Sequence, residues 1–400
     1  MAGATEPLEA PRIRISPLRW IRRNLFSSVS NSLLTIVSLL VIYKLVSGLL
    51  SWAFTEARWG VVTENLKLFM MGRYPPEEVW RVGVSVLVIS FLFGLSWGVW
   101  GGVVRSFSIA LAAFFVTLAV LPFGTSVRLW LAGNAALIVG TALLVRLVPG
   151  RFWKRAVLIG WLLSFPLIYV LLYGKVGGLQ LLPTVSTTLW GGLLLTFLLT
   201  IVGILVSIPL GILLALGRRS ELPVVRWFSV GFIEVVRGVP LVTVLFFASL
   251  ILPLFLPKGM NVDLMWRIAV GIVLFSAAYN AENVRGGLQA IPPGQIEAAK
   301  ALGMKGWTIT SLIVLPQALR LVIPTTVGQF ISLFKDTSLV SIVGLLDLMY
   351  IASKAVLAQP EWRGLQQEVF VFVAVIYFIF SFAMSYASQR LEVKLGVGER

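Results

Sequence analysis

Four consecutive polar residues interrupt an apolar run in the C-terminal half of the chain, namely Lys335, Asp336, Thr337 and Ser338. Lysine supplies a cation, aspartate supplies an anion, and the two hydroxyl groups both donate and accept hydrogen bonds. A dry cavity that binds a small ligand with an ammonium and a carboxylate group needs groups of both signs close together. These residues are therefore substrate-site candidates, although their side chains cannot all face one ligand. The alternative is a solvated helix break at the outer surface.

A second polar group lies near the end of another apolar run, where Tyr279, Asn280 and Glu282 precede Arg285. Polar side chains within a membrane span are usually functional or paired, so the first three are candidates for the substrate pathway. The alternative is a structural ion pair between Glu282 and Arg285, which lie three residues apart on one helical turn.

The same spacing separates Glu234 from Arg237, just before Gly238 and Pro240. Side chains three residues apart are neighbours on a helix surface. We therefore predict a local ion pair at the entry to the next span. These residues, together with Gly238 and Arg285, are expected to have a structural or coupling role.

The segment from Glu297 to Gly303 is a polar, helix-prone interruption that reads Glu-Ala-Ala-Lys-Ala-Leu-Gly. Its first six residues favour helix, and the glycine permits a turn that a residue with a side chain resists. We predict a short helix that ends in a bend. Its small apolar stripe, with charged flanks, is expected to seat in a groove on another protein, and this stripe consists of Ile296, Ala299, Leu302 and Gly303.

Nine residues after this segment the chain reads Ile-Val-Leu-Pro, ending at Pro316. The spacing of the two pieces resembles that of the loops by which membrane subunits of transporters dock on a partner, and the alternative is an ordinary loop helix between two spans. This resemblance assigns docking to Glu297, Ala298, Ala299, Leu302, Gly303 and Pro316.

Composition defines the broad class of protein. Apolar residues make up 58% of the 400 residues and charged residues 12%. Soluble domains average about one half apolar and about one quarter charged. Apolar runs of about 18 to 25 residues recur along the chain, and each can cross a hydrocarbon core of about 30 Å as a helix. The sequence therefore predicts an all-α, polytopic membrane protein and excludes a soluble enzyme.

Several chemistries are excluded by the residues that the chain lacks. It has no cysteine and no histidine, so we expect no catalytic residue, no metal site and no bound cofactor. A Gly-x-x-x-x-Gly-Lys-Ser/Thr phosphate-binding loop is missing, so any ATP hydrolysis belongs to a partner. The net charge of +16 does not indicate nucleic-acid binding, because the basic residues cluster at the ends of apolar runs.

The apolar runs predict about ten membrane spans, which fall into a front group of five and a second group of five. Their approximate bounds are Asn31–Phe54, Val82–Gly101, Phe107–Phe123, Leu129–Leu147, Ala156–Tyr173, Leu189–Leu216, Pro240–Leu256, Ile268–Val284, Leu319–Leu345 and Val369–Tyr386. We accordingly predict an N-terminal segment 1–30, a front extension 31–174, a five-span core 187–389 with a docking loop 292–316, and a tail 390–400.

The distribution of basic residues predicts the orientation. With the N-terminus in the cytoplasm, roughly 21 Lys and Arg residues lie inside and roughly 11 outside. We therefore expect both termini and the loop 292–316 to be cytoplasmic, and residues 174–186 to lie on the outer face.

Small residues recur every fourth position in the sixth predicted span, at Gly203, Ser207, Gly211 and Ala215. They remove bulk from one face of a helix, so that another helix can approach closely. The face packs either within the chain or at a subunit interface.

The spacing Glu-Ala-Ala, three residues, Gly, nine residues, Ile-x-Leu-Pro resembles the loop by which membrane subunits of ABC importers dock on their ATPase subunits. Residues 232–241, 277–292 and 329–339 look like the permeases of polar amino-acid uptake systems. That resemblance covers about residues 187–389. The front extension is similar to that of general L-amino-acid importers.

This resemblance implies a type I ABC importer permease core that takes up L-amino acids by alternating access across a bacterial inner membrane. It also implies partner ATPase subunits that bind ATP and Mg, and a periplasmic substrate-binding protein. A second homologous permease is implied as well, and the asymmetric extension favours a heterodimer over a homodimer.

Two other classes of protein are alternatives. A secondary transporter or channel would use Lys44, Glu282 and Asp336 as ion sites without ATP. A membrane-embedded enzyme is the weaker alternative, because the sequence supplies no evident pair of nucleophile and base.

Overall fold

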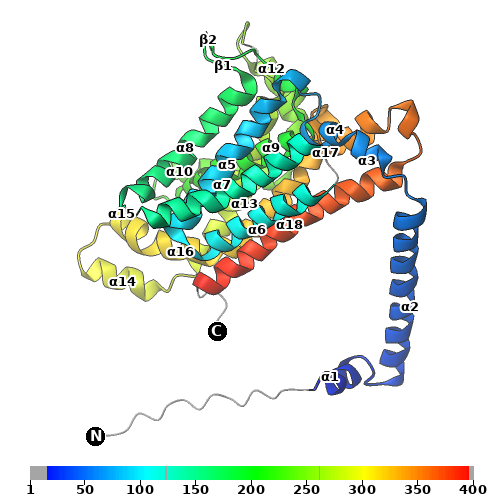
Figure 1. Ribbon diagram of the computed structural model, residues 1–400. Helices are drawn as coiled ribbons and strands as arrows, with labels where there is room; N and C mark the ends of the chain where they lie inside the picture. Colours follow the sequence, from blue (N-terminus) through cyan, green and yellow to red (C-terminus); the bar gives the residue numbers. More distant parts are fainter. Residues whose placement is uncertain (1–15, 122–123, 149, 261, 396–400) are drawn as a thin grey trace. The chain divides into compact units, whose positions relative to one another are not determined.

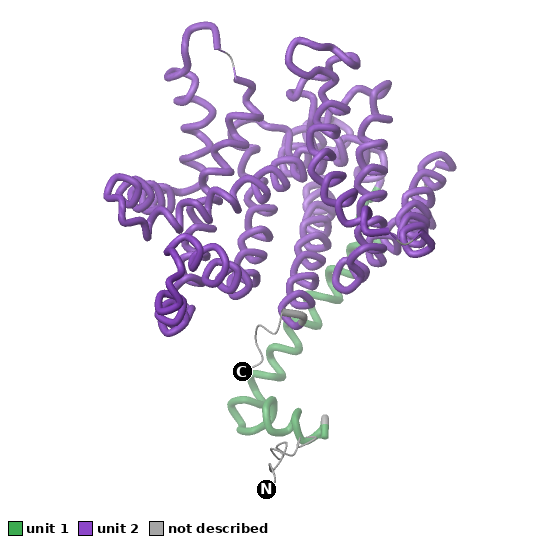
Figure 2. The backbone as a smooth tube through the Cα atoms, turned by 90° about the vertical axis from the view of Figure 1, so that its left-hand side faces the viewer, with its two compact units in different colours: residues 1–59 green, residues 60–400 purple. Residues whose placement is uncertain are grey.

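The computed structural model describes residues 16–121, 124–148, 150–260 and 262–395. Most of this backbone is helical (Figure 1), as predicted for a polytopic membrane protein. Helices satisfy their own backbone hydrogen bonds where water is absent, which is why they span membranes. The chain divides into two compact units, residues 1–59 and 60–400 (Figure 2).

The first unit contains helix α1 (Pro17–Asn24) and the membrane-length helix α2 (Val29–Ser51), which a π-helical turn extends to Glu56. Ser28 caps α2, because its hydroxyl accepts a hydrogen bond from the backbone N–H of Asn31 at 3.1 Å. The first predicted span is thus confirmed as a helix. Residues 1–15 of the predicted N-terminal segment lie outside the described residues.

The second unit begins with two short helices, α3 (Gly60–Glu64) and α4 (Leu66–Met71), and a 3₁₀ turn at Pro76–Glu78. The four remaining front spans follow and confirm the predicted ones: α5 (Val79–Trp100), α6 (Gly102–Val120), α7 (Thr125–Leu147) and α8 (Phe152–Tyr173). The predicted end of the third span, Phe123, lies outside the described residues.

Glycine separates α5 from α6. Gly101 has φ +58° and Gly102 has φ +53°, and residues with a side chain rarely adopt such a positive φ. The chain can therefore reverse without a longer loop, and α6 returns alongside α5.

Four further long helices also match the prediction. They are α9 (Gly192–Arg218), α13 (Leu264–Gln289), the helical run from Gly306 to Val343, and α18 (Gln366–Leu395). That run consists of α15 (Gly306–Ile309), a π-turn (Thr310–Val314), α16 (Leu315–Asp336) and a 3₁₀ segment (Thr337–Val343). Residues 396–400 of the predicted tail lie outside the described residues, and 390–395 belong to α18.

The predicted span Pro240–Leu256 has a different form in the structure. Helix α10 (Pro223–Gly238) is followed by α11 (Leu241–Phe246), a π-turn (Phe247–Ile251) and α12 (Leu252–Phe255), and the pair is bent by 107°. Pro240 causes the break, since proline lacks a donor and disfavours helix in the residue before it. The described residues hold nine membrane-length helices, or ten if this bent pair counts as one.

The remaining elements are short and lie between the long helices. They are the antiparallel hairpin β1 (Lys175–Val176) and β2 (Leu179–Gln180), a 3₁₀ turn (Thr187–Leu189), β3 (Leu346–Asp347), α17 (Leu348–Tyr350), a π-turn (Ile351–Val356) and a 3₁₀ turn (Pro360–Trp362). In the hairpin, Lys175 pairs with Gln180 and Val176 with Leu179.

The small-residue stripe of α9 packs within the chain. Gly203, Ser207, Gly211 and Ala215 are all buried. A Cβ atom at Gly211 would lie only 2.7 Å from the Cβ of Asn280 on α13, so the two helices touch closely there. The interpretation of intrachain packing is confirmed, and these four positions do not form an exposed face.

The front helices and the core helices share one interior within the unit 60–400. Tyr74 donates its hydroxyl hydrogen to the carbonyl of Leu172 at 2.9 Å, and both residues belong to the same hydrophobic cluster as Leu195 of α9. Phe69 of α4 packs against Phe372 of α18, with ring centroids 5.0 Å apart. Packing is therefore continuous across residues 174–187, where we predicted the boundary between extension and core.

Candidate functional site

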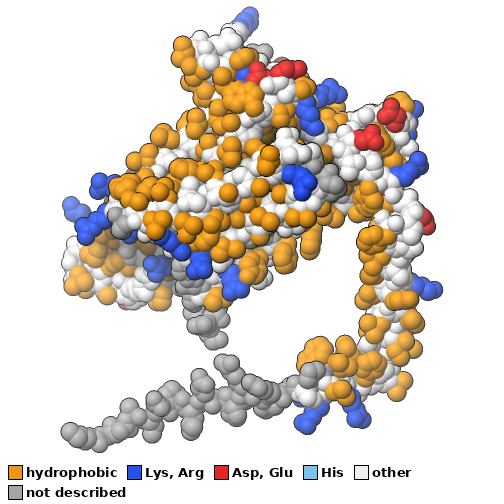
Figure 3. Space-filling model, viewed as in Figure 1, with side chains coloured by type: hydrophobic (Ala, Val, Ile, Leu, Met, Phe, Trp, Pro, Cys, Tyr) orange, Lys and Arg blue, Asp and Glu red, His pale blue; other side chains and the backbone are white. Residues whose placement is uncertain are grey.

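The long helices of the second unit have two ends, which we name after the predicted docking loop and after the β-hairpin. The docking end holds the α5–α6, α7–α8 and α9–α10 junctions and helix α14 (Pro293–Ala301), and the hairpin end holds β1 and β2 (Figure 1). In Figure 3, Lys and Arg gather at the docking end, whereas Asp and Glu are visible mainly toward the other end. This asymmetry is the one that the positive-inside rule associates with a cytoplasmic face.

Helix α14 confirms the predicted short helix ending in a bend. It starts at Pro293, where proline is tolerated in a first turn, and ends at Ala301. Gly303 has φ +74° and forms the turn, while the N–H of Met304 donates to the carbonyl of Ala299 at 3.1 Å. No atom lies within 4 Å of a Cβ built at Gly303, so backbone conformation rather than space requires glycine there.

The predicted docking stripe is divided between two directions, which corrects our expectation. Ala299 is buried and Ile296 half-buried, and both pack into a cluster with Ala281 of α13 and Ala318 of α16. Leu302 is instead 82% exposed. The helix ends before Leu302, whose φ of −78° and ψ of 5° take it out of the helical period, so the stripe does not continue.

The free surface of this region contains residues that the stripe analysis missed. Trp307 is 74% exposed and Leu312 69% exposed, and they follow α14 closely in the chain. Glu297 and Ala298 on α14 are also exposed. A lone tryptophan between the small polar residues of a loop was the available sequence signal, because a large exposed aromatic side chain is typical of a contact surface.

The second half of the predicted loop is helical. Pro316 is exposed and is the second residue of α16, directly after the π-turn Thr310–Val314 within the helical run Gly306–Val343. Gln317 donates to the side-chain oxygen of Gln295 and to the carbonyl of Ile313, each at 2.8 Å. This pair joins α14 to the start of α16, and sequence reasoning had not identified it.

Glu282 is the centre of an ion network at the docking end. Its carboxylate accepts from Nε of Arg285 at 2.6 Å, lies 3.4 Å from Arg237, and lies 3.5 Å from Arg218. The predicted ion pair between Glu282 and Arg285 is confirmed. The network joins three helices, because Arg218 belongs to α9, Arg237 to α10, and Glu282 and Arg285 to α13.

The predicted pair between Glu234 and Arg237 is wrong. Glu234 pairs with Arg218 at 3.0 Å, and Arg237 pairs with Glu282. Arg218, the last residue of α9, lies next to α10. Glu234 and Arg237 therefore each pair with a residue of another helix. Gly238 is the last residue of α10, and a Cβ there would meet no atom within 4 Å.

Tyr279 and Asn280 point in different directions, although they are adjacent. Asn280 is 2% exposed and donates to Ser207 of α9 at 2.9 Å, whereas its Oδ1 has no hydrogen-bond partner among the described residues. Tyr279 packs against Phe275 with ring centroids 4.9 Å apart, and its own ring centroid lies 5.5 Å from Cζ of Arg237. The structure therefore brings Tyr279 to the ion network and Asn280 into the α9–α13 interface.

The four polar residues of the proposed substrate site lie where the α-helix changes into a 3₁₀ helix. Lys335 and Asp336 are the last residues of α16, and Thr337 and Ser338 begin the 3₁₀ segment. Lys335 is exposed and Asp336 half-buried, while Thr337 is fully buried and donates to the carbonyl of Phe334 at 2.6 Å. These differences in burial agree with our expectation that the four side chains cannot face one ligand.

Asp347 is a buried carboxyl group that sequence reasoning missed. It caps α17, accepting from the backbone N–H groups of Met349 at 2.9 Å and Tyr350 at 3.1 Å. The residue is fully buried, and burial raises its pKa to about 7. The sequence signal was an aspartate placed three residues before a tyrosine in the polar gap between two spans.

The apolar long helices define a polytopic membrane protein, and the short helix α14 is exposed at one end of them. A family model described as the inner membrane component of binding-protein-dependent transport systems matches residues 207–395. The inner membrane amino-acid ABC transporter permease YhdY of Escherichia coli K12 is 42% identical over 395 residues, covering 95% of this chain and 93% of that protein.

The chain is also similar to two further proteins. The glutamate/glutamine/aspartate/asparagine transport system permease BztC of Rhodobacter capsulatus is 38% identical over 435 residues, which covers 97% of this chain and 96% of that protein. A crystal structure of an amino acid ABC transporter with histidines is 30% identical, with a TM-score of 0.45, covering 50% of this chain and 90% of that chain.

The chain belongs to the family of inner membrane components of binding-protein-dependent transport systems. The predicted resemblance to ABC importer permeases is thereby confirmed. YhdY and BztC align over more than nine tenths of this chain, so the similarity includes the sequence of the front part as well as that of the core.

Proposed function

We propose that this chain is the transmembrane permease subunit of an ATP-driven importer that takes up L-amino acids by alternating access. The observation that carries the proposal is the exposed helix α14 with its Gly303 turn, at the end of the molecule where basic residues gather. The names of YhdY and BztC support amino acids as the substrate class. ATP and Mg are bound and used by separate ATPase subunits, and this chain is not itself an enzyme.

Docking in this proposal uses the free side of α14. Ala298 and Ala301 leave little bulk, and Leu302 and Trp307 add apolar area that becomes buried when an ATPase subunit binds. Glu297 and Lys300 flank that area with opposite charges. The ATPase therefore contacts the face of the helix that does not pack on the permease.

Movement of α14 is passed to the membrane helices by contacts on its other side. Ala299 packs against residues of α13 and α16, and Gln295 is hydrogen-bonded to Gln317 at the start of α16. A displacement of α14 therefore moves both helices, because close-packed contacts transmit strain rather than absorb it. The Glu282 network extends this coupling to α9 and α10.

Substrate contact is proposed at two places along the chain. Lys335 and Asp336 provide the charges opposite to those of a zwitterionic amino acid, and Thr337 and Ser338 provide hydroxyl groups near them. Tyr279, Asn280 and Glu282 form the second group. Asn280 is the one whose free Oδ1 supports a pathway role, since a buried acceptor without a partner is costly unless it is used in another state.

The partners and location follow the same proposal. A periplasmic binding protein delivers the amino acid, and a second homologous permease completes a heterodimer. Both termini are cytoplasmic in the bacterial inner membrane. The functional segments are 1–30, 31–174, 187–389 with the docking loop 292–316, and 390–400.

Reconstitution into proteoliposomes tests this proposal. The chain is expressed with the other subunits of its transport system, and uptake of radiolabelled L-amino acids is measured with ATP inside or outside the vesicles and with vanadate. Uptake that requires ATP and is abolished by vanadate supports an ABC importer. Uptake driven by an ion gradient without ATP would instead support the secondary transporter.

A further inference from the structure

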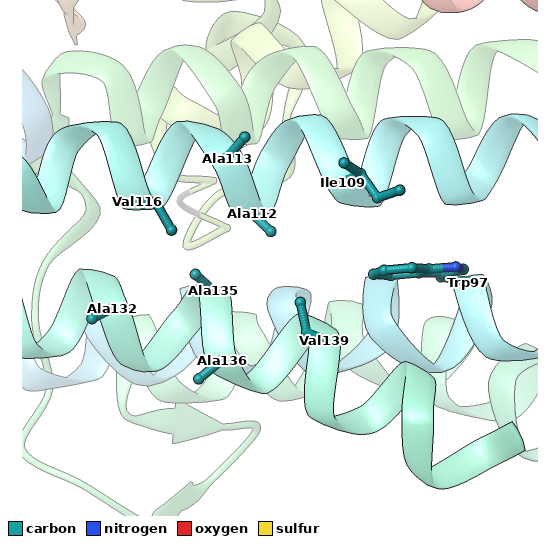
Figure 4. A pocket seen from close by; sticks show the side chains of 9 residues that line it. All are labelled: Trp97, Ile109, Ala112, Ala113, Val116, Ala132, Ala135, Ala136 and Val139. Carbon is teal, nitrogen blue, oxygen red and sulfur yellow. The ribbon is translucent and has the colours of Figure 1, made fainter. Parts of the chain in front are cut away.

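An apolar groove of about 470 Å³ lies between α6 and α7 in the front part of the second unit (Figure 4). Ile109, Val116 and Val139 on its walls are 42%, 51% and 39% exposed, so the groove opens at the surface of two membrane-length helices. Its lining contains Trp97, Ile109, Ala112, Ala113, Val116, Ala132, Ala135, Ala136 and Val139.

Each of the two helices that line the groove has an arginine just outside the groove, toward the docking end. Arg105 precedes Ile109 by four residues on α6, and Arg146 follows Val139 by seven residues on α7. These spacings keep each arginine on the helix face that lines the groove. Both side chains are exposed. Two cations therefore stand where the groove meets the docking end.

Trp97 adds a hydrogen-bond donor at the same end. Its ring closes the groove, and the guanidinium of Arg146 lies 5.7 Å from the ring centroid. Its indole Nε1 is buried and has no hydrogen-bond partner among the described residues. In Figure 4 the ring nitrogen is at the edge away from Val116, which is the side of the docking end. Buried tryptophan N–H groups normally have an acceptor, so this donor lacks its usual partner.

We propose that this groove binds an anionic phospholipid. One acyl chain occupies the apolar groove, and the phosphate lies between Arg105 and Arg146, where two cations attract it in a charge-assisted contact. The site is separate from docking and substrate contact, and it does not depend on the proposed transport function.

A membrane helix is the other occupant that such a groove admits. Ala132, Ala136 and Gly140 repeat every fourth residue on α7 and would let a helix approach. The charges favour the lipid, however. Arg105 and Arg146 are both exposed at one end of the groove and attract an anion, which an apolar helix does not offer.

Native mass spectrometry of the full-length chain tests this site. The protein is incubated with phosphatidylglycerol or with phosphatidylcholine of the same acyl chains, and the retained lipid is measured. We expect phosphatidylglycerol to be retained more strongly, and Arg146→Gln to lower its retention about fivefold through loss of one cation. Arg226→Gln removes an exposed arginine of α10, away from the groove, and is expected to change nothing.

The apolar part of the site is tested by filling it. Ala136→Phe, from the exposed side of α7, and Ala113→Phe, from α6, are each expected to lower retention of both lipids about fivefold or more. Leu162→Phe adds a ring at a position of α8 that is 71% exposed and outside the lining, and it serves as the control. Thermal unfolding of each variant verifies that it folds.

Three outcomes would overturn the proposal. The first is equal retention of the two lipids by the wild type, and the second is equal retention by Arg146→Gln and Arg226→Gln. The third comes from the absence of native cysteine, which makes Ala136→Cys a unique reactive site. Cross-linking of this cysteine to a neighbouring membrane helix in native membranes, with no lipid retained, would assign the groove to that helix.

Discussion

Gly72 and Trp190 pair through their backbones in an antiparallel bridge that joins the segment after α4 to the segment before α9. Gly191 and Gly192 follow Trp190 in the chain. Gly191 forms a parallel bridge with Leu346, and Gly192 forms one with Asp347. Three segments that are far apart in sequence therefore contact one another through backbone bridges. The front segment is thereby attached to the start of α9, a core helix that also ends in the ion network.

Glycine is required at this meeting point. We expect Gly192→Ala to destabilise the protein by about 1–3 kcal/mol, because a side chain must be placed at a positive φ. The φ is +58°, and the added Cβ would lie 2.1 Å from the carbonyl oxygen of Phe69. Thermal unfolding in detergent measures the loss. Gly178→Ala, where a Cβ meets no atom within 4 Å, is the matched control, and an equal shift in both variants would contradict the prediction.

Docking depends on the conformation of the turn after α14. Gly303→Val forces a branched side chain to a φ of +74°, and Glu297→Lys reverses a flanking charge. We expect either change to lower co-purification of the ATPase subunits about tenfold or more. Wild-type co-purification of both variants would remove α14 from the docking surface.

The exposed tryptophan next to α14 is expected to supply much of the contact. Trp307→Ala should weaken binding of the ATPase by about 2 kcal/mol, as for a buried aromatic residue at an interface centre. Trp227→Ala removes a side chain on α10 that is equally exposed, at 74%, and should leave binding unchanged. Binding is measured by titrating purified ATPase. Equal losses in the two variants would show that the effect is not specific to the docking surface.

The two carboxylates of the ion network should differ in importance. Glu282→Gln leaves three arginines without their common anion, and we expect a loss of stability on the order of 1–3 kcal/mol together with a loss of uptake. Glu234→Gln removes a single contact at a side chain that is 55% exposed, and its effect should be within about 1 kcal/mol. Melting temperature and vanadate-sensitive uptake compare the two. The opposite order would contradict the central position of Glu282.

Lys335 and Asp336 are tested as substrate contacts. If they line the amino-acid site, Lys335→Met or Asp336→Leu leaves one charged end of the substrate unpaired, which costs about 1–3 kcal/mol. Uptake should fall about tenfold at matched expression, while association with the ATPase persists. Near-normal uptake in both variants would favour the solvated helix break.

Asp347 should make stability depend on pH. Its pKa of about 7 in the folded protein lies above the ordinary value of 3.8, so the folded state binds the proton more tightly than the unfolded state. Stability from this group is therefore present at low pH and is lost as the pH rises toward 7. Asp347→Asn retains the cap of α17 without the titration, and its melting temperature should decline less between pH 5 and pH 8. Equal declines would assign the pH dependence to other groups.

The sequence predicted the features that depend on nearby residues. Membrane spans were predictable, because the length of an apolar run determines whether it can cross a bilayer as a helix. The helix Pro293–Ala301 and its turn at Gly303 were predictable for a similar reason, since propensity and capping act within a few residues. The ion pair between Glu282 and Arg285 also joins neighbours on one helical turn.

Only the tertiary structure decided which side chains meet across helices. Glu234 and Arg237 were expected to pair, but Arg218 and Glu282 arrive from α9 and α13 and take their place. Ala299 faces the permease and Leu302 faces outward because α13 and α16 lie on one side of α14. Whether a polar or small residue is buried depends on the helix packed against it, and local sequence does not specify that neighbour.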